Sequence, residues 1–143
     1  MSTRREVLAQ GASLAAALAG LGLLPQAAQA AWSQAAFEAK TMSDLMKALG
    51  TSNPAESKDV SITGPDIAEN GAVVPVGAAT TLAGAKRLLL LVEKNPNMLA
   101  AAFDLSDAVE PNISTRVKMG QSSNVFAVAI TADNKVLYAV KEI

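Results

Sequence analysis

The chain has 143 residues, enough for one folded domain, and 50% of them are apolar, so it can bury a core. Only 3% are aromatic, so aliphatic side chains must fill that core. The formal charge of −1 argues against binding to nucleic acid or to an anionic membrane. The sequence contains neither histidine nor cysteine, which excludes Ser-His-Asp and Cys-His catalysis, thiolate metal sites and disulfides. We therefore expect no cofactor and no metal centre.

The first thirty residues have the basic, apolar and small-residue order of an export signal. Arg4 and Arg5 open it, an apolar run rich in alanine and glycine covers 7–24, and Ala28 and Ala30 place small residues where a signal peptidase reads. Adjacent arginines are typical of the twin-arginine type. A membrane-spanning helix is the alternative, because 18 residues lie at the lower limit for crossing a bilayer. We expect a twin-arginine-type signal peptide over 1–30, cleavage after Ala30, a periplasmic product and no remaining membrane anchor.

Helical periodicity follows in residues 31–49. Apolar residues recur there at spacings of three and four: Trp32, Ala36, Phe37, Leu45, Met46 and Leu49. Thr41 and Asp44 resemble a capping box, which predicts the start of a second short helix, and Gly50 predicts its end. An apolar stripe of this kind indicates packing, so we expect the helices to cover a sheet.

Beyond residue 52, short apolar runs alternate with turn residues. The spacing predicts seven strands, at 60–63, 72–79, 87–93, 99–105, 114–119, 124–131 and 135–143. A parallel α/β sheet needs long crossover connections, and no gap between these runs is long enough for one. The pattern therefore favours a mainly β fold: an immunoglobulin-like antiparallel β-sandwich with short N-terminal helices.

Alternation is clearest in the run 124–131. The larger residues lie on one face of this run: Phe126, Val128 and Ile130. The smaller residues lie on the other face: Val125, Ala127 and Ala129. We expect the larger three to face the core. Asp133 and Asn134 then predict a hairpin between the last two strands.

Two carboxylate pairs stand out, Asp66 with Glu69 and Asp104 with Asp107. Such pairs can bind calcium or act as acid and base, and they more often close turns through their own backbone. A carboxylate-based hydrolase using Asp66, Glu69 or Asp104 is therefore the weakest of the functional hypotheses. Pro75, in the strand that follows the first pair, indicates a position at a sheet edge.

Several segments resemble a known family. Trp32 with 35–40 is one of them, and the others, in chain order, are 65–76, 91–97 and 114–123. Together they resemble SoxY, the family of sulfur-carrier proteins of bacterial thiosulfate oxidation, along the whole length of the chain. The resemblance implies an immunoglobulin-like sandwich that forms a heterodimer with SoxZ.

The resemblance also implies a non-catalytic role. In the family, a C-terminal Gly-Gly-Cys-Gly-Gly arm holds sulfur intermediates on its cysteine while other Sox enzymes load, hydrolyse and oxidise them. This sequence departs from the pattern, because it reaches Ile143 without a cysteine, so no residue can be assigned as the attachment site. We expect a truncated carrier whose cysteine would lie beyond Ile143. The alternative is an armless periplasmic protein-interaction module of the same fold.

Overall fold

The computed structural model describes residues 3–6, 8 and 34–143. The chain divides into two units, Met1–Trp32 and Ser33–Ile143, and we describe each by itself. In the first unit, a helical turn at residues 4–6 is held by Thr3 and Glu6. The Thr3 N–H donates to the Glu6 carboxylate at 2.7 Å, and the Glu6 N–H donates to Thr3 Oγ1 at 3.3 Å. Within the described ranges, no helix is long and apolar enough to cross a membrane.

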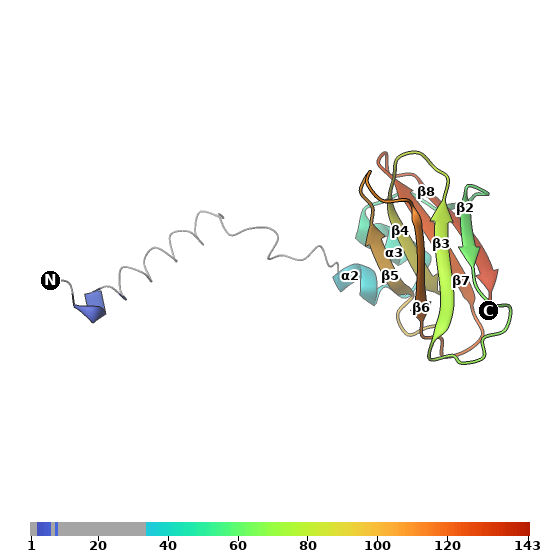
Figure 1. The fold of residues 1–143 in the computed structure, drawn as a ribbon, viewed down its shortest axis with the longest axis horizontal. Helices are drawn as coiled ribbons and strands as arrows, with labels where there is room; N and C mark the ends of the chain where they lie inside the picture. Colours follow the sequence, from blue (N-terminus) through green and yellow to red (C-terminus); the bar gives the residue numbers. More distant parts are fainter. Residues whose placement is uncertain (1–2, 7, 9–33) are drawn as a thin grey trace. The chain divides into compact units, whose positions relative to one another are not determined.

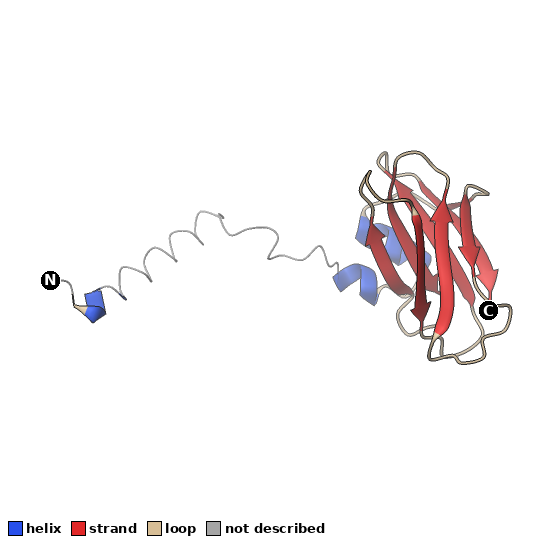
Figure 2. Cartoon of the chain, viewed as in Figure 1, coloured by secondary structure: helices blue, strands red, loops and turns tan. Residues whose placement is uncertain are grey.

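The second unit is a sandwich of two β-sheets with two short helices (Figures 1 and 2). The helices are α2 (Gln34–Glu38) and α3 (Met42–Leu49). The strands are β1 (Ala55–Glu56), β2 (Val60–Thr63), β3 (Val74–Thr80), β4 (Ala85–Val92), β5 (Leu99–Asp104), β6 (Asn112–Val117), β7 (Asn124–Thr131) and β8 (Val136–Glu142). One sheet has the order β1-β8-β7-β4-β5 and the other β2-β3-β6. Every strand pair is antiparallel except β1 with β8, so the predicted fold class is confirmed.

Strand β4 lies inside the larger sheet, between β7 and β5, and is buried on both faces. Its run Leu88, Leu89, Leu90, Leu91 and Val92 is fully buried at 0% exposure. Leu88 and Leu90 pack in the core between the two sheets, whereas Leu89 and Leu91 pack in a second core under the helices. Continuous apolar sequence, in place of alternation, is what a strand covered on both faces requires.

The two faces of β7 are divided between the same two cores. The three larger residues do share one face, as the alternation predicts, but that face lies under the helices. The smaller Val125, Ala127 and Ala129 face the other sheet, so the prediction that the larger three face the sandwich core was wrong. Small side chains on β7 fit beside the large leucines of neighbouring β4, because close packing alternates large and small residues.

Helix α3 has both of its predicted caps. Thr41 Oγ1 accepts the Asp44 N–H at 3.1 Å, which satisfies one of the free donors of the first turn. Gly50 ends the helix with φ 68°, in the left-handed region that glycine adopts without a steric cost. Leu45 and Met46 are buried against the five-stranded sheet, so the helices cover a sheet face as expected.

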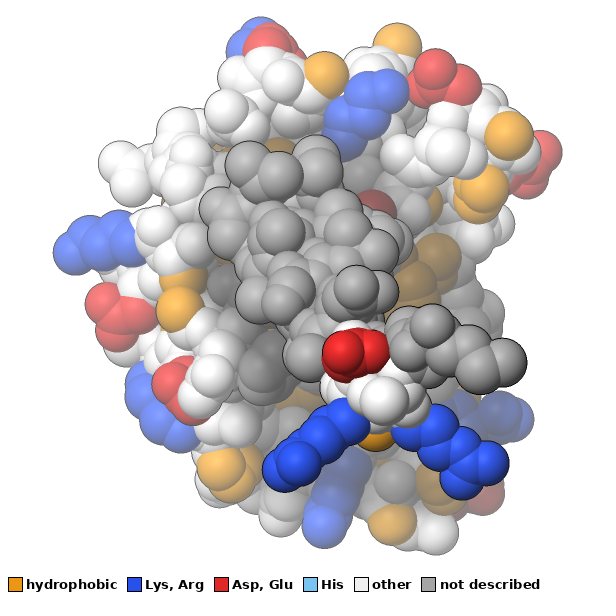
Figure 3. Space-filling view, turned by 90° about the vertical axis from the view of Figure 1, so that its left-hand side faces the viewer, with side chains coloured by type: hydrophobic (Ala, Val, Ile, Leu, Met, Phe, Trp, Pro, Cys, Tyr) orange, Lys and Arg blue, Asp and Glu red, His pale blue; other side chains and the backbone are white. Residues whose placement is uncertain are grey.

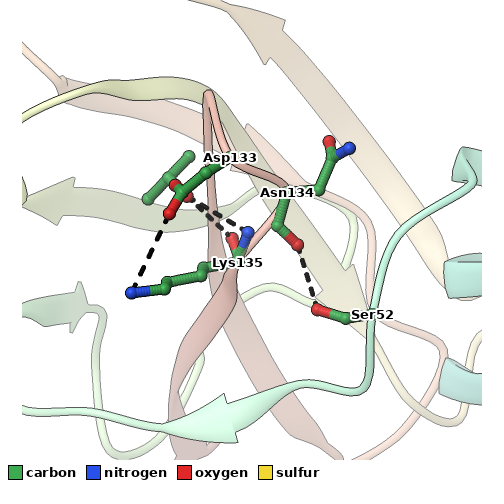
Figure 4. Close-up of polar contacts among 5 residues, drawn as sticks. Ser52, Asp133, Asn134 and Lys135 are labelled. Carbon is green, nitrogen blue, oxygen red and sulfur yellow. Dashed lines mark hydrogen bonds and ion pairs between the residues drawn. The ribbon is translucent and has the colours of Figure 1, made fainter.

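The predicted hairpin joins β7 to β8 (Figure 4). Asn134 has φ 62°, and the Lys135 N–H donates to Thr131 Oγ1 at 3.1 Å across the turn. Asp133 lies 3.8 Å from Lys135 Nζ, and Ser52 Oγ donates to the Asn134 carbonyl at 3.0 Å. This last bond ties the hairpin to the segment that precedes β1.

Candidate functional site

The candidate site lies where the chain reaches its last residue, at the end of β8. The Ile143 N–H donates to the Ser123 carbonyl at 3.0 Å, and the Ser123 N–H donates to the Ile143 carbonyl at 2.9 Å. This reciprocal pair continues the β7–β8 ladder beyond Asn124 and Glu142. The Ile143 side chain is 6% exposed and belongs to the core between the sheets. The last residue is therefore part of the folded sheet.

Gly64 makes room for that side chain. A Cβ atom added at Gly64 would stand 2.9 Å from Ile143 Cδ1 and 3.5 Å from the Pro75 carbonyl. Pro75 lies in β3, the central strand of its sheet, where it pairs with Arg116 of β6. On its other side, β2 has already ended, because the last β2–β3 pair is Thr63 with Gly77. Strand β3 is therefore not an edge strand, as Pro75 had indicated, but proline, which cannot donate to a ladder, occupies a position beyond the end of the neighbouring strand β2.

A cavity of about 290 Å³ opens beside Ile143. Ile143 lines it together with residues from the 66–71 loop and from the 119–122 loop. The two loops meet where the Met119 N–H donates to the Gly71 carbonyl at 2.7 Å. A Cβ atom at Gly71 would lie 2.7 Å from the Met119 carbonyl oxygen, so this contact needs glycine.

An ion pair joins the first of these loops to the last strand. Lys141 Nζ donates to Asp66 Oδ1 at 2.7 Å. The hydrogen bond from Lys141, and then its positive charge, lower the pKa of Asp66 from its ordinary value of 3.8. Asp66 is therefore a carboxylate near neutral pH and is unsuited to act as a general acid.

Each of the other carboxylates considered from the sequence has surroundings of its own. Asp104 pairs with Arg87 at 2.7 Å and Asp107 pairs with Lys86 at 3.1 Å, both on the exposed surface. Glu69 is exposed. Across residues 3–6, 8 and 34–143, the structure holds no group of three or more His, Cys, Asp or Glu side chains that could bind a metal ion. These pairings give the hydrolase hypothesis no support.

The export residues are described only in part. Arg4 and Arg5 are exposed in the turn that Thr3 and Glu6 cap. Ala28 and Ala30, the expected cleavage positions, lie outside the described residues. Among the side chains of the Ser33–Ile143 unit that Figure 3 shows, acidic and basic ones are interspersed.

Sequence reasoning missed Lys141, Ser123 and Gly64 as members of the site. Lys141 pairs with a residue 75 positions away, and Ser123 is brought to Ile143 by the β7–β8 register. No local pattern marks such long-range partners. The one usable signal was the group of turn residues from Gly64 to Asp66, which indicates a tight loop but not its partner.

Comparisons with known proteins identify the family. The model of the family described as "Sulfur oxidation protein SoxY" matches residues 45–143. The structure of the sulfur carrier protein SoxY from Chlorobium limicola f thiosulfatophilum is similar, with 32% identity and a TM-score of 0.64, covering 72% of this chain and 93% of that chain.

Two further solved structures share the fold alone, and both are superoxide reductases (neelaredoxins) from Ignicoccus hospitalis that carry single substitutions. The lysine variant has 17% identity and a TM-score of 0.53, covering 62% of this chain and 81% of that chain. The alanine variant has 15% identity and a TM-score of 0.53, covering 73% of this chain and 87% of that chain. No curated protein matches the chain. The family model and the 32% identical carrier structure together establish that the chain belongs to the SoxY family.

Proposed function

We propose that this chain is the folded body of a sulfur-carrier subunit of a periplasmic thiosulfate-oxidising system. Membership of the SoxY family is the observation that carries the proposal. The anchored end of β8 supports it, because Ile143 is fixed by two backbone hydrogen bonds to Ser123 and borders a cavity. A segment that follows Ile143 would leave the domain from a fixed point. A Gly-Gly-Cys-Gly-Gly arm at that point would hold the sulfur intermediates on its cysteine.

The proposed role is non-catalytic. Glycines on both sides let an arm cysteine enter narrow active sites, since they add no side chain and little stiffness. The chemistry would then belong to the other Sox enzymes that load, hydrolyse and oxidise the bound sulfur. The body would supply docking, with a SoxZ-like subunit as its heterodimer partner.

An armless interaction module is the second candidate. The observation that favours it is the absence of cysteine from all 143 residues. Such a protein would keep the docking function of the fold and would carry no sulfur. The two candidates therefore differ in one measurable property, covalent loading, and agree in another, partner binding.

Loading is tested by intact-mass measurement on three forms of the mature protein, each with a SoxZ-like subunit, thiosulfate and the Sox loading enzymes. One form ends at Ile143, one continues into Gly-Gly-Cys-Gly-Gly, and the matched control continues into Gly-Gly-Ser-Gly-Gly. The proposal expects a sulfur adduct on the cysteine form alone. Adduct on either cysteine-free form would contradict it. A cysteine form that binds the SoxZ-like subunit but stays unloaded would support the armless module.

A further inference from the structure

The two sheets contain unequal numbers of strands, and this leaves a groove at one side of the sandwich. The larger sheet ends at β5 and the smaller one at β6. Between these end strands lies an open groove of about 510 Å³, lined by residues 99–101 of β5, by 115–117 of β6 and by Lys118 just beyond β6. The groove therefore occupies the place that a further strand beside β6 would fill.

The backbone of β6 presents hydrogen-bonding groups at the outer edge of the smaller sheet, beside this groove. The Thr80 N–H donates to the Pro111 carbonyl, and hydrogen-bonded and non-hydrogen-bonded pairs alternate along an antiparallel ladder. The registered pairs Gly77–Ser114 and Pro75–Arg116 are then of the non-hydrogen-bonded kind. The N–H and C=O groups of Ser114 and Arg116 consequently point away from β3, to the outer edge of the sheet.

Strand β6 is better suited to accept a strand than β5. All six of its residues pair with β3 in continuous register. The β4–β5 ladder shifts between Leu90 and Leu91, which leaves Ala100 of β5 without a registered partner. Bulges of this kind interrupt an edge and oppose strand addition. The small side chains of Ala100 and Ala101 instead give the groove a shallow wall along which an extended backbone fits.

Two exposed basic residues border the groove. Arg116 and Lys118 line it, and its lining contains no acidic residue. Neither side chain forms an ion pair with another described residue, and Arg116 lies opposite Pro75 on β3. An acidic segment would find both cations available, whereas a basic one would be repelled.

The end of the groove is held in place by the loop between β4 and β5. Asn95 Nδ2 donates to the Lys118 carbonyl at 2.7 Å, and the Gly120 N–H donates to Asn95 Oδ1 at 3.3 Å. Lys40 Nζ donates to Asn97 Oδ1 at 2.8 Å and also to the Pro96 carbonyl. A site that is already ordered has less conformational entropy to lose on binding.

We propose that β6 receives an extended acidic segment of a partner protein, which adds a fourth strand to the smaller sheet. Backbone hydrogen bonds to Ser114 and Arg116 would give the segment its register, and the charges of Arg116 and Lys118 would select its acidity. This inference does not depend on whether the chain carries sulfur.

The experiment measures the binding of two fluorescein-labelled peptides by fluorescence anisotropy, one of alternating valine and glutamate and one of alternating valine and lysine. The glutamate peptide should bind, and added salt should weaken it. The double variant Arg116→Glu/Lys118→Glu should weaken binding about tenfold or more. The control is Lys47→Glu/Lys58→Glu, which makes the same change in net charge at exposed positions outside the groove and should leave binding unchanged.

A backbone variant separates strand addition from simple charge attraction. Ser114→Pro removes one outward N–H and leaves the charges and the β3 ladder intact, so it should weaken the glutamate peptide about tenfold without changing the melting temperature much. The proposal is overturned if the glutamate peptide fails to bind at about 1 mM, if the lysine peptide binds equally well, or if Ser114→Pro has no effect. Self-association of the chain that Ser114→Pro abolishes would assign the edge to a second copy instead.

Discussion

Asp66 and Lys141 connect the 66–71 loop to the last strand, and their pairing makes stability depend on pH. The pKa of Asp66 in the folded protein is below its ordinary value of 3.8. The ion pair therefore contributes its full stabilisation above that value, and this stabilisation is lost as the pH falls through the lowered pKa. Asp66→Asn should therefore lower the free energy of unfolding near neutral pH, and the difference from the parent should shrink in acid. Denaturant melts over a pH series measure this.

The matched control for this prediction is Glu69→Gln, which removes a charge from the same loop but breaks no ion pair among the described residues. Near neutral pH, Glu69→Gln should lower the free energy of unfolding by less than Asp66→Asn does. Added salt should reduce the effect of Asp66→Asn, since the pair is exposed and screened. If the free energy of unfolding is the same for Asp66→Asn and the parent protein across the pH series, the pair contributes nothing to stability.

Two core substitutions should lower the free energy of unfolding by different amounts, because the two side chains are buried to different extents. Leu90 is fully buried between the sheets, so Leu90→Ala should cost about 2–5 kcal/mol in free energy of unfolding. Phe126 is only partly buried at the helix-covered face, with its ring 5.6 Å from that of Tyr138. Phe126→Ala should cost less than Leu90→Ala despite removing more atoms. A larger loss for Phe126→Ala in denaturant melts would mean that the helix-covered face dominates stability.

At the level of single residues, the sequence shows what chemistry a side chain could perform better than it shows which residue that side chain contacts. Asp66 is recognisable as a loop carboxylate, yet only the fold brings Lys141 to it and makes it an ion-pair residue in place of a catalytic one. The end of the chain shows the same difference. Ile143 reads as a strand residue, whereas its pairing with Ser123 depends on the register of β7 and β8.

The C-terminal cap of α3 gives a prediction at the level of the element. Gly50 has φ 68°, and no neighbouring group lies within 4 Å of the position that an added Cβ atom would take. Gly50→Ala should therefore be destabilising through backbone strain alone, by about 1 kcal/mol. Gly120 has equally open surroundings without a positive φ, and Gly120→Ala is the control. Thermal melts should show a loss for Gly50→Ala only, and equal losses would exclude strain as the cause.

Elements bounded by strong turn chemistry are well predicted. The bounds of β2 and β7 agree with the sequence prediction, and those of the other five predicted strands differ by one or two residues at their ends. Strand β1 was missed because it has two exposed residues and pairs with β8 only through the fold. Alternation showed that β7 has two unlike faces, but both are buried, so the pattern could not tell which face meets the other sheet.

Export concerns the whole molecule. Arg4→Lys/Arg5→Lys keeps the charge but should hold the precursor in the cytoplasm, because a twin-arginine receptor reads the arginines themselves. Mass spectrometry of cell fractions should find the parent protein in the periplasm without its first thirty residues. Arg116→Lys, the same exchange on the exposed surface of β6, is the control. Unimpaired export of the double variant would contradict the twin-arginine interpretation.

The reciprocal hydrogen bonds between Ile143 and Ser123 have a consequence for tethering. A group attached a few residues beyond Ile143 would be confined to a small volume, because five extended residues reach at most about 18 Å. Short flexible tethers of this kind give effective concentrations on the order of millimolar. A partner enzyme that docks with its active site inside that radius would meet the attached group at such a concentration, however dilute the protein is in the surrounding solution.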